Sequence, residues 1–429
     1  MKLLIKGGRI INPADQLDIT GDILVENGKI AAIGQNLAAD GAQVIDAAGL
    51  IVAPGLVDMH VHLREPGLEA KEDIASGTRA AAAGGFTTVA CMPNTKPAVD
   101  NSILVSGLLQ RGQTEGVVNL KVIGALSKGL EGKELAEIGD MIAAGAVAIS
   151  DDGGHLDSTR LLKTGLEYTG MFDCPVITHS EDEELACEGY MHEGAVSAML
   201  GLKGRPAVAE DIAVARDIML AEYTNSPIHI AHVSSKGAVE IIRQAKQRGV
   251  KVTAEATPHH LTLTDEELKS FNTAFKVNPP LRSSDHVEAL IAGLKDGTLD
   301  AIATDHAPHA FEEKDVEFRY APSGFAGLET ALAVVLTGLY HTGRLTLMEV
   351  IDKMSYAPAK ILGLNSGELK VGAPADITIF DTEYKWVVNC INFYTRGKHS
   401  PYEGRNFKGK SLITIVNGSI IMQNGEVLK

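Results

Sequence analysis

Two histidines stand one residue apart in the stretch DMHVHLR, residues 58–64. His60 and His62 close an apolar run that begins LIVAPGLV, which is typical of a buried strand. Residues two apart on a strand point to the same face, so both imidazoles can bind one metal ion. Arg64 follows two places later, at the mouth of the same segment.

Further nitrogen and carboxylate side chains stand where later apolar segments end. They are Asp151 and Asp152 in AISDD, His179 in VITHS, His232 in HIAHVS and Asp305 in IATDHAPH. In a parallel barrel the carboxyl ends of the strands meet on one rim, which would bring these groups together. Taken singly, each has an ordinary alternative as a hydrogen-bonded or capping residue. Together they favour a site for zinc or another borderline divalent cation.

Three other histidines are expected to play structural or supporting roles. His229 lies three residues before His232, so it should face the other side of that strand and lie deeper. His259 and His260, in TPHHL, follow the next apolar segment.

The middle of the chain alternates apolar strand segments with helical patterns such as AEDIAVARDIMLAEY and SKGAVEIIRQAKQRG. Eight strands separated by helices predict an α/β protein with a (β/α)8 TIM-type barrel. The alternative is an open doubly wound sheet, but no GxGxxG opens a helix after the first strand. The predicted strands are 51–62, 86–92, 119–126, 145–151, 175–179, 227–233, 250–257 and 299–305.

Both ends of the chain have a different style. The first fifty residues and the last sixty are rich in β-branched residues punctuated by Gly and Asn-Gly, the pattern of short strands and hairpins. We therefore expect one small composite β domain from residues 1–53 and 365–429, and a catalytic barrel from residues 54–364.

Composition limits the function. The 39 Lys and Arg residues against 55 Asp and Glu give a net charge of −16, with no long basic run, which argues against nucleic acid or an anionic membrane as the main partner. Four scattered cysteines without a CxxC pair indicate reduced thiols. With no apolar run of roughly 18 residues, a cytoplasmic enzyme is expected.

The motifs PGLVDMHVHLREPG, ACMPNT, ISDDGG, THSED, IAHVSS, NPPLR and ATDHAPH, in this order, resemble the bacterial long-chain dihydroorotases of the amidohydrolase superfamily. The resemblance spans nearly the whole chain. It implies a zinc-dependent cyclic amide hydrolase of pyrimidine biosynthesis, which interconverts N-carbamoyl-L-aspartate and L-dihydroorotate.

The resemblance also implies two Zn²⁺ ions per subunit, bridged by an aspartate and a hydroxide. His60, His62 and Asp305 match the ligands of the first ion, and His179 and His232 those of the second. Many superfamily members bridge the ions with a carboxylated lysine after strand four, but no lysine stands there in this chain. Asp152 matches the bridging aspartate of the family, whereas spacing alone does not separate it from Asp151.

Asp305 is the expected general acid and base, and Arg64 the expected partner of the substrate carboxylate, since a guanidinium can hold a carboxylate through two hydrogen bonds. The other positions that match substrate-binding residues of the family are His62, Asn94, Asn278, His309, Ser323 and Gly324.

Several alternatives stay open on the sequence. Another cyclic amide hydrolase (a dihydropyrimidinase, hydantoinase or allantoinase) would share the barrel, and a weakly active scaffold subunit for aspartate carbamoyltransferase would share the family. A homodimer is expected because two-fold oligomers are the commonest. The charged segment 310–322 is either a flap over the site or an ordinary solvated loop.

Overall fold

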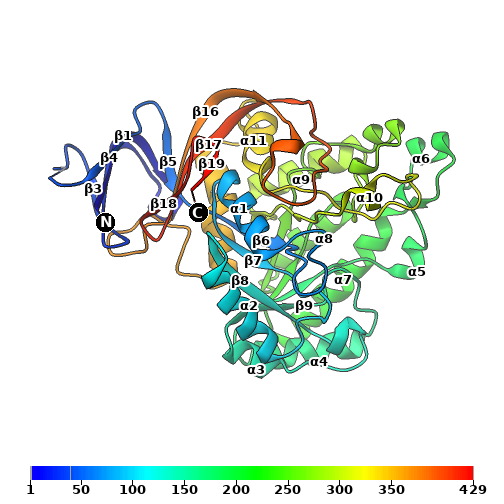
Figure 1. The fold of residues 1–429 in the computed structure, drawn as a ribbon. Coiled ribbons are helices and arrows are strands. Elements are labelled where there is room, and N and C mark those ends of the chain that lie inside the picture. The colour runs from blue at the N-terminus through cyan, green and yellow to red at the C-terminus, as the bar shows by residue number, and fades with distance from the viewer. Residues whose placement is uncertain (1, 39, 429) are drawn as a thin grey trace.

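The computed structural model describes residues 2–38 and 40–428, which form a barrel and a separate sheet beside it (Figure 1). The barrel has eight parallel strands that follow one another in chain order around the sheet. Its first and last strands meet through a parallel bridge between Val61 and His306, where the His62 N–H donates to the His306 carbonyl at 2.8 Å. The strands are β6 (Leu56–Val61), β7 (Phe86–Cys91), β8 (Asn119–Ala125), β9 (Ala146–Ser150), β10 (Val176–Thr178), β13 (Ile228–Ile230), β14 (Val252–Ala256) and β15 (Ala301–Ile302).

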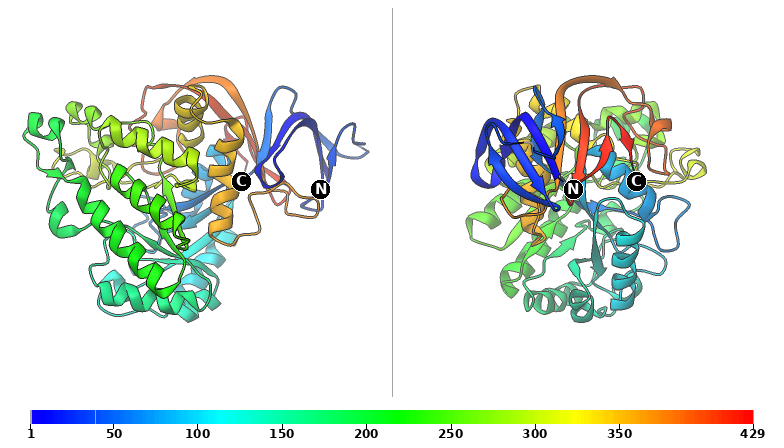
Figure 2. Two further views of the ribbon diagram at one scale, coloured as in Figure 1. Left: turned by 180° about the vertical axis from the view of Figure 1, so that it is seen from behind. Right: turned by 60° about the vertical axis from the view of Figure 1, so that its left-hand side comes forward.

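Helices surround this barrel and cover the outer face of its strands (Figures 1 and 2). No helix within the described residues is long and apolar enough to cross a membrane. The helices are α1 (Ile74–Gly84), α2 (Ser102–Thr114), α3 (Ile138–Ala143), α4 (Thr159–Gly170), α5 (Glu183–Ala186), α6 (Ala195–Leu200), α7 (Ala207–Thr224), α8 (Lys236–Gln247), α9 (Ser284–Asp296), α10 (Phe311–Lys314), α11 (Ala331–Val335), α12 (Leu347–Ile351) and α13 (Ala357–Ile361).

The periodicity of the sequence explains these elements. In α8 the buried residues Ala238, Val239, Ile242 and Ala245 recur at helical spacing, and the Ser235 side chain caps the helix by accepting from the Ala238 N–H. The six residues of β6, LVDMHV, are all buried, as expected for a barrel strand with packing on both faces.

Below the rim, the barrel interior is filled by side chains and is not a channel. Alanines, among them Ala90, Ala148 and Ala303, alternate there with the larger Met59 and Ile123. This packed layer lies directly beneath the polar residues of the rim.

The separate sheet is built from both chain ends, which lie side by side in Figures 1 and 2. Its N-terminal and C-terminal halves join where β5 pairs antiparallel with β16, Pro54 opposite Ile377. Its strands are β1 (Lys2–Asn12), β2 (Leu17–Glu26), β3 (Lys29–Gly34), β4 (Gln43–Asp46), β5 (Ile51–Pro54), β16 (Ile377–Val387), β17 (Asn406–Val416), β18 (Ser419–Gln423) and β19 (Glu426–Val427). A third, two-stranded sheet pairs β11 (Met191–His192) with β12 (Gly204–Arg205).

One strand prediction is wrong in extent. Residues 51–62 were expected to form a single barrel strand, but the chain leaves the terminal sheet after Pro54 and enters the barrel at Leu56. Gly55 makes this change of sheet, with its N–H donating to the Asp376 carbonyl at 2.9 Å. A Cβ at Gly55 would lie 2.1 Å from Thr87 Oγ1, so only glycine fits between the two sheets.

The strand predicted at 299–305 is also shorter, because β15 ends at Ile302. Beyond it, the Ala303 N–H still donates to the Ala256 carbonyl, whereas the Thr304 N–H donates to the side-chain carboxylate of Asp58 at 3.2 Å. The regular backbone ladder is therefore interrupted just before Asp305, and the chain pairs with Val61 at His306.

Gly55→Ala should lower the free energy of unfolding by about 1–3 kcal/mol, the usual cost of forcing an extra carbon into a packed interior. Gly107→Ala is the matched control, because Gly107 lies in α2 with open space where its Cβ would stand. It should raise stability by about 0.5–1 kcal/mol through helix propensity. Urea denaturation of both variants checks the pair, and equal effects would contradict the role given to Gly55.

Candidate metal centre and substrate cavity

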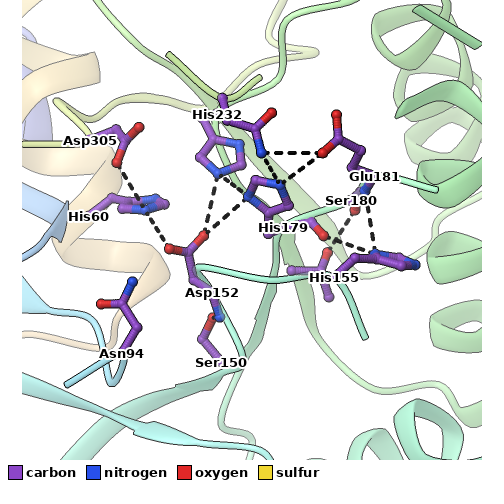
Figure 3. Close-up of polar contacts among 12 residues, drawn as sticks. His60, Asn94, Ser150, Asp152, His155, His179, Ser180, Glu181, His232 and Asp305 are labelled. Atoms are coloured by element: carbon purple, nitrogen blue, oxygen red, sulfur yellow. Dashed lines mark hydrogen bonds and ion pairs between the residues drawn. The ribbon is translucent and has the colours of Figure 1, made fainter. Parts of the chain in front are cut away.

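Six buried side chains from five strand ends converge on one point of the rim, and all of them except His62 are labelled in Figure 3. In Figure 3, Asp152 lies at the centre, with His60 on one side and the pair His179 and His232 on the other. None of the six is more than 9% exposed. The six are His60 at the end of β6, His62 just after it, Asp152 after β9, His179 after β10, His232 after β13 and Asp305 after β15.

The first cluster of ligand atoms contains the Nε2 atoms of His60 and His62. Asp152 Oδ2 lies 3.4 Å from the first and 3.5 Å from the second. Asp305 Oδ1 lies 3.7 Å from the His60 nitrogen and 3.1 Å from the His62 nitrogen. Two nitrogens and two carboxylate oxygens therefore surround one small volume.

The second cluster uses the other oxygen of the same aspartate. Asp152 Oδ1 lies 3.3 Å from His232 Nε2 and 3.7 Å from His179 Nδ1, and these two nitrogens are 3.0 Å apart. Asp152 thus presents one oxygen to each cluster, which is the arrangement that a bridging carboxylate requires.

The donor atoms fit a divalent ion. Bonds of about 2.0–2.2 Å from zinc to nitrogen and oxygen put tetrahedral ligand atoms roughly 3.3–3.6 Å apart, close to the separations in both clusters. His60 Nε2 and Asp152 Oδ1 are buried without a hydrogen-bond partner among the described residues. Buried polar atoms left without partners are rare, so these atoms are suited to ligate a cation.

Glu255 on β14 supports the first cluster from below. Its Oε1 accepts a hydrogen bond from His60 Nδ1 at 2.8 Å, which leaves the Nε2 lone pair of His60 free for an ion. Just beyond β6, Asn94 Oδ1 lies 2.8 Å from His62 Nδ1 and orients that ring in the same way. Both imidazoles are held with Nε2 toward Asp152.

The electrostatics of the centre also favour a cation. Burial raises the pKa of Asp152, but the surrounding imidazoles, His60 foremost, bring it well below its ordinary value. Burial lowers the pKa of His60, while Asp152 and Glu255 raise it well above the usual range. The pocket therefore keeps its carboxylates ionised and attracts positive charge.

Three residues of the rim hold a left-handed backbone. Their φ angles are 62° at Arg64, 33° at His232 and 48° at Asp305. Side chains other than glycine rarely adopt this region, and such conformations concentrate at functional sites. Here each one turns a side chain at a strand end toward the cavity.

The two clusters open into a cavity of about 230 Å³. All the substrate-binding positions expected from the sequence line it, as do five of the six expected metal ligands, with His62 counted in both sets. The lining comprises His62, Arg64, Asn94, Asp152, Gly153, His179, His232, Asn278, Asp305, Ala307, His309, Ser323 and Gly324.

Arg64 is the cation of this cavity. Its side chain is buried, 8% exposed as a residue, and its Nε donates to the Pro308 carbonyl at 3.2 Å. It forms no ion pair with a carboxylate of the described residues, although a buried charge is costly without a partner. A ligand carboxylate would supply that partner.

The neutral polar groups of the cavity are held by their own neighbours. The Nε2–H of His309 donates to the Ser323 carbonyl at 2.8 Å, and burial together with Arg64 lowers the pKa of His309 to about 3, so its ring is neutral. Asn278 accepts from Arg205 Nη1 at 2.7 Å and donates to Glu181 at 3.2 Å. These contacts fix the donors and acceptors before a ligand arrives.

The structure separates residues that spacing left together. Asp151 turns away from the centre, and its Oδ1 accepts from the backbone N–H groups of Leu126 and Ser127, both at 2.8 Å. His229 lies deeper, with Nε2 3.3 Å from Glu255. His260 is bound between Thr257 and the Pro279 carbonyl and does not reach the two clusters.

Three residues at the site were not found from the sequence: Glu255, Glu181 and Arg205. Glu255 stands in VTAEAT, where a charged residue in an apolar strand was a usable signal for a buried partner. Glu181 lies in the loop after β10 and Arg205 in β12, and nothing in the local sequence indicates their pairing, 2.7 Å between Arg205 Nη1 and Glu181 Oε2.

The chain is similar to known proteins over its whole length. Residues 49–238 match the family model described as dihydro-orotase-like. A protein named dihydroorotase from Pelobacter propionicus is 53% identical over 422 residues, 98% of this chain and 99% of the relative. Another of that name, from Citrifermentans bemidjiense, is 53% identical over 424 residues, covering 99% of this chain and 100% of the relative.

Solved structures share the fold. L-hydantoinase (dihydropyrimidinase) from Arthrobacter aurescens superposes with a TM-score of 0.90 at 28% identity, covering 100% of this chain and 97% of that one. A dihydropyrimidinase from Brevibacillus agri gives a TM-score of 0.87 at 24% identity, with 100% and 96% covered, which shows the fold alone.

Asp152→Asn should remove most of the bound metal, because an amide supplies neither the charge nor both oxygens to two clusters. Asp151→Asn is the matched control, adjacent in sequence and also a carboxylate, but turned toward backbone N–H groups. Metal content after zinc loading and desalting, measured by atomic emission, checks the pair. Equal metal content in both variants would contradict the central position of Asp152.

Proposed function

The chain belongs to the dihydroorotase family, and we propose that it interconverts L-dihydroorotate and N-carbamoyl-L-aspartate. The observation that best supports this substrate is the buried Arg64, which lacks an ion-pair partner among the described residues and lines the same cavity as the His and Asp clusters. Both the cyclic and the open form of this substrate carry a carboxylate that a guanidinium can hold.

We propose two zinc ions per subunit. His60, His62 and Asp305 would hold one, His179 and His232 the other, and Asp152 would contribute one oxygen to each. A bound ion of this kind polarises a carbonyl group and lowers the pKa of a water molecule to about 7. Two cations repel strongly at short range, and the carboxylate of Asp152 between them offsets that repulsion.

Asp305 is the proposed general acid and base. Ring opening requires a proton at the amide nitrogen as the C–N bond breaks, and ring closure requires its removal from the same nitrogen. Burial raises the pKa of Asp305, but the hydrogen bond with His62 and the neighbouring imidazole charges bring it below the ordinary value. The carboxylate is therefore available as a base at neutral pH.

The remaining residues would orient the substrate. Arg64 would bind the carboxylate with help from Asn94 and His309, which lie on the same wall of the cavity. Asn278 and the backbone of Ser323 and Gly324 would contact the ring. Because Arg64 is buried, its interaction with a carboxylate is shielded from water and stronger than at the surface.

A second candidate follows from the fold. The closely superposing L-hydantoinase structure raises hydrolysis of hydantoins or dihydropyrimidines as the alternative activity. Against it stands the unpaired guanidinium of Arg64, since the ring of a dihydropyrimidine without a carboxylate would leave that charge buried and alone.

We also propose a homodimer, the commonest closed assembly of soluble proteins, and an association with aspartate carbamoyltransferase as the partner to test. A cytoplasmic location is proposed because all four cysteines are free thiols. The scaffold alternative would require the metal centre to be inactive although its ligands are present.

The experiment that tests the function is turnover of the zinc-replete protein on L-dihydroorotate, with dihydrouracil, hydantoin and allantoin assayed beside it. Selective ring opening of L-dihydroorotate that a chelator abolishes and zinc restores is the expected result. Preference for dihydrouracil or hydantoin would favour the second candidate, and no turnover with metal bound would favour the scaffold.

Asp305→Asn should reduce turnover on L-dihydroorotate by about 10² or more, the usual scale for a lost general acid and base. Near-normal turnover would exclude Asp305 from proton transfer. Because Asp305 is also a proposed ligand, metal content is measured on the same sample, and turnover is expressed per bound ion.

Arg64→Lys keeps the charge but loses the planar fork, so KM for L-dihydroorotate should rise about tenfold or more with metal content unchanged. Steady-state kinetics and metal analysis check both halves of this expectation. Loss of metal in this variant would instead place Arg64 among the residues that maintain the metal centre.

A further inference from the structure

A buried lysine lies behind the part of the cavity lining that Ser323 and Gly324 form. Lys314, at the end of α10, is 2% exposed and donates from Nζ to two carbonyl oxygens, Pro322 at 2.9 Å and Gly324 at 2.8 Å. It forms no ion pair with a carboxylate within the described part of the chain. A buried ammonium that binds only carbonyl groups is costly, so its position needs a reason.

The two acceptors stand on either side of Ser323. The Pro322 carbonyl belongs to the same peptide group as the Ser323 N–H, so a cation on that oxygen polarises that N–H. No atom of the described residues accepts a hydrogen bond from the Ser323 N–H. The next N–H group, that of Gly324, donates to the Lys276 carbonyl at 2.9 Å. Ser323 and Gly324 line the substrate cavity, so an unused donor stands at its wall.

Neighbouring contacts leave this stretch little freedom. The Ser323 carbonyl accepts from His309, and the Lys314 carbonyl accepts from Thr273 Oγ1 at 2.7 Å. Gly324 has a φ of 114°, and a Cβ there would lie 2.7 Å from the Ala307 carbonyl oxygen. Lys314 is thus the cation at the centre of a turn whose residues Ser323 and Gly324 line the cavity.

We propose that Lys314 is a positioning residue for the cyclic amide substrate, fixing and polarising the Ser323 peptide so that its N–H donates to an oxygen of the bound ring. This inference rests on the proposed function, since it concerns the substrate of that same cavity. A charge-assisted donor of this kind binds oxygen more strongly than an ordinary amide.

The chain offers a matched control in Lys276. Its side chain is also buried and also donates only to carbonyls, Phe318 at 2.9 Å and Arg319 at 2.8 Å. These acceptors belong to the same segment, 310–322, but not to the Ser323 peptide. Removal of the Lys276 ammonium therefore tests the packing of the segment without the polarisation of Ser323.

The test compares Lys314→Met with Lys276→Met as zinc-replete full-length enzymes at pH 6. Burial lowers the pKa of Lys314 to about 7 and of Lys276 to about 8, so both ammonium ions predominate at that pH in the parent protein. We expect Lys314→Met to raise KM for L-dihydroorotate about tenfold with unchanged metal content, and Lys276→Met to change KM by less than about twofold. Lys314→Arg, which keeps a cation, should recover part of the loss.

Equal increases in KM for both methionine variants would overturn the proposal, because the segment would then matter only as packing. An unchanged KM in a folded Lys314→Met enzyme would overturn it as well. If that variant does not fold, Lys314→Gln, which keeps a donor but no charge, is measured with the same two criteria. If the parent enzyme does not turn over L-dihydroorotate, the result counts against the proposed function. In that case hydrogen exchange still tests Lys314: an equal acceleration at residues 318–326 in both methionine variants would count against its special role.

Discussion

The structure depends on one buried carboxylate that must serve two groups of imidazoles. Asp152 presents one oxygen to His60 and His62 and the other to His179 and His232, at 3.3–3.7 Å. Burial of a carboxylate and four imidazoles is costly unless they are close enough to pair with one another or with a bound ion. The four strand ends that carry these residues must therefore meet within a few ångströms, and a closed barrel satisfies that demand.

In the barrel, a packed interior layer and hydrogen bonds from neighbouring residues hold these side chains in place. Small and apolar side chains such as Ala148 and Ile123 fill the interior below the rim, so the polar groups stand on a packed layer. Glu255 and Asn94 then fix the rings of His60 and His62 from behind. Ligands held in advance lose little freedom when an ion binds, which is the physical basis of a preorganised centre.

In the proposed function, substrate recognition and metal binding are served by side chains of one cavity. The His and Asp clusters, Arg64, and Ser323 and Gly324 of the turn held by Lys314 all contribute to its lining. The close superposition on a hydantoinase shows that the barrel itself does not choose the substrate. In the proposed function, this choice falls to side chains that line the cavity, above all the guanidinium of Arg64, which has no ion-pair partner among the described residues.

The sequence by itself determined the fold class and the ligand types, because strand and helix periodicities and strand-end histidines are local patterns. It also placed both chain ends in one β structure, as β5 and β16 show. It did not place the boundary at Gly55, since that glycine is required by Thr87, more than thirty residues away. Spacing left Asp151 and Asp152 open and the family resemblance matched Asp152, whereas the tertiary structure shows the reason: Asp151 binds backbone N–H groups and Asp152 lies between the imidazoles. Only the tertiary structure revealed Glu255, Arg205 and Lys314. Each of these roles depends on distances between strands and loops remote in sequence, and no local pattern encodes such distances.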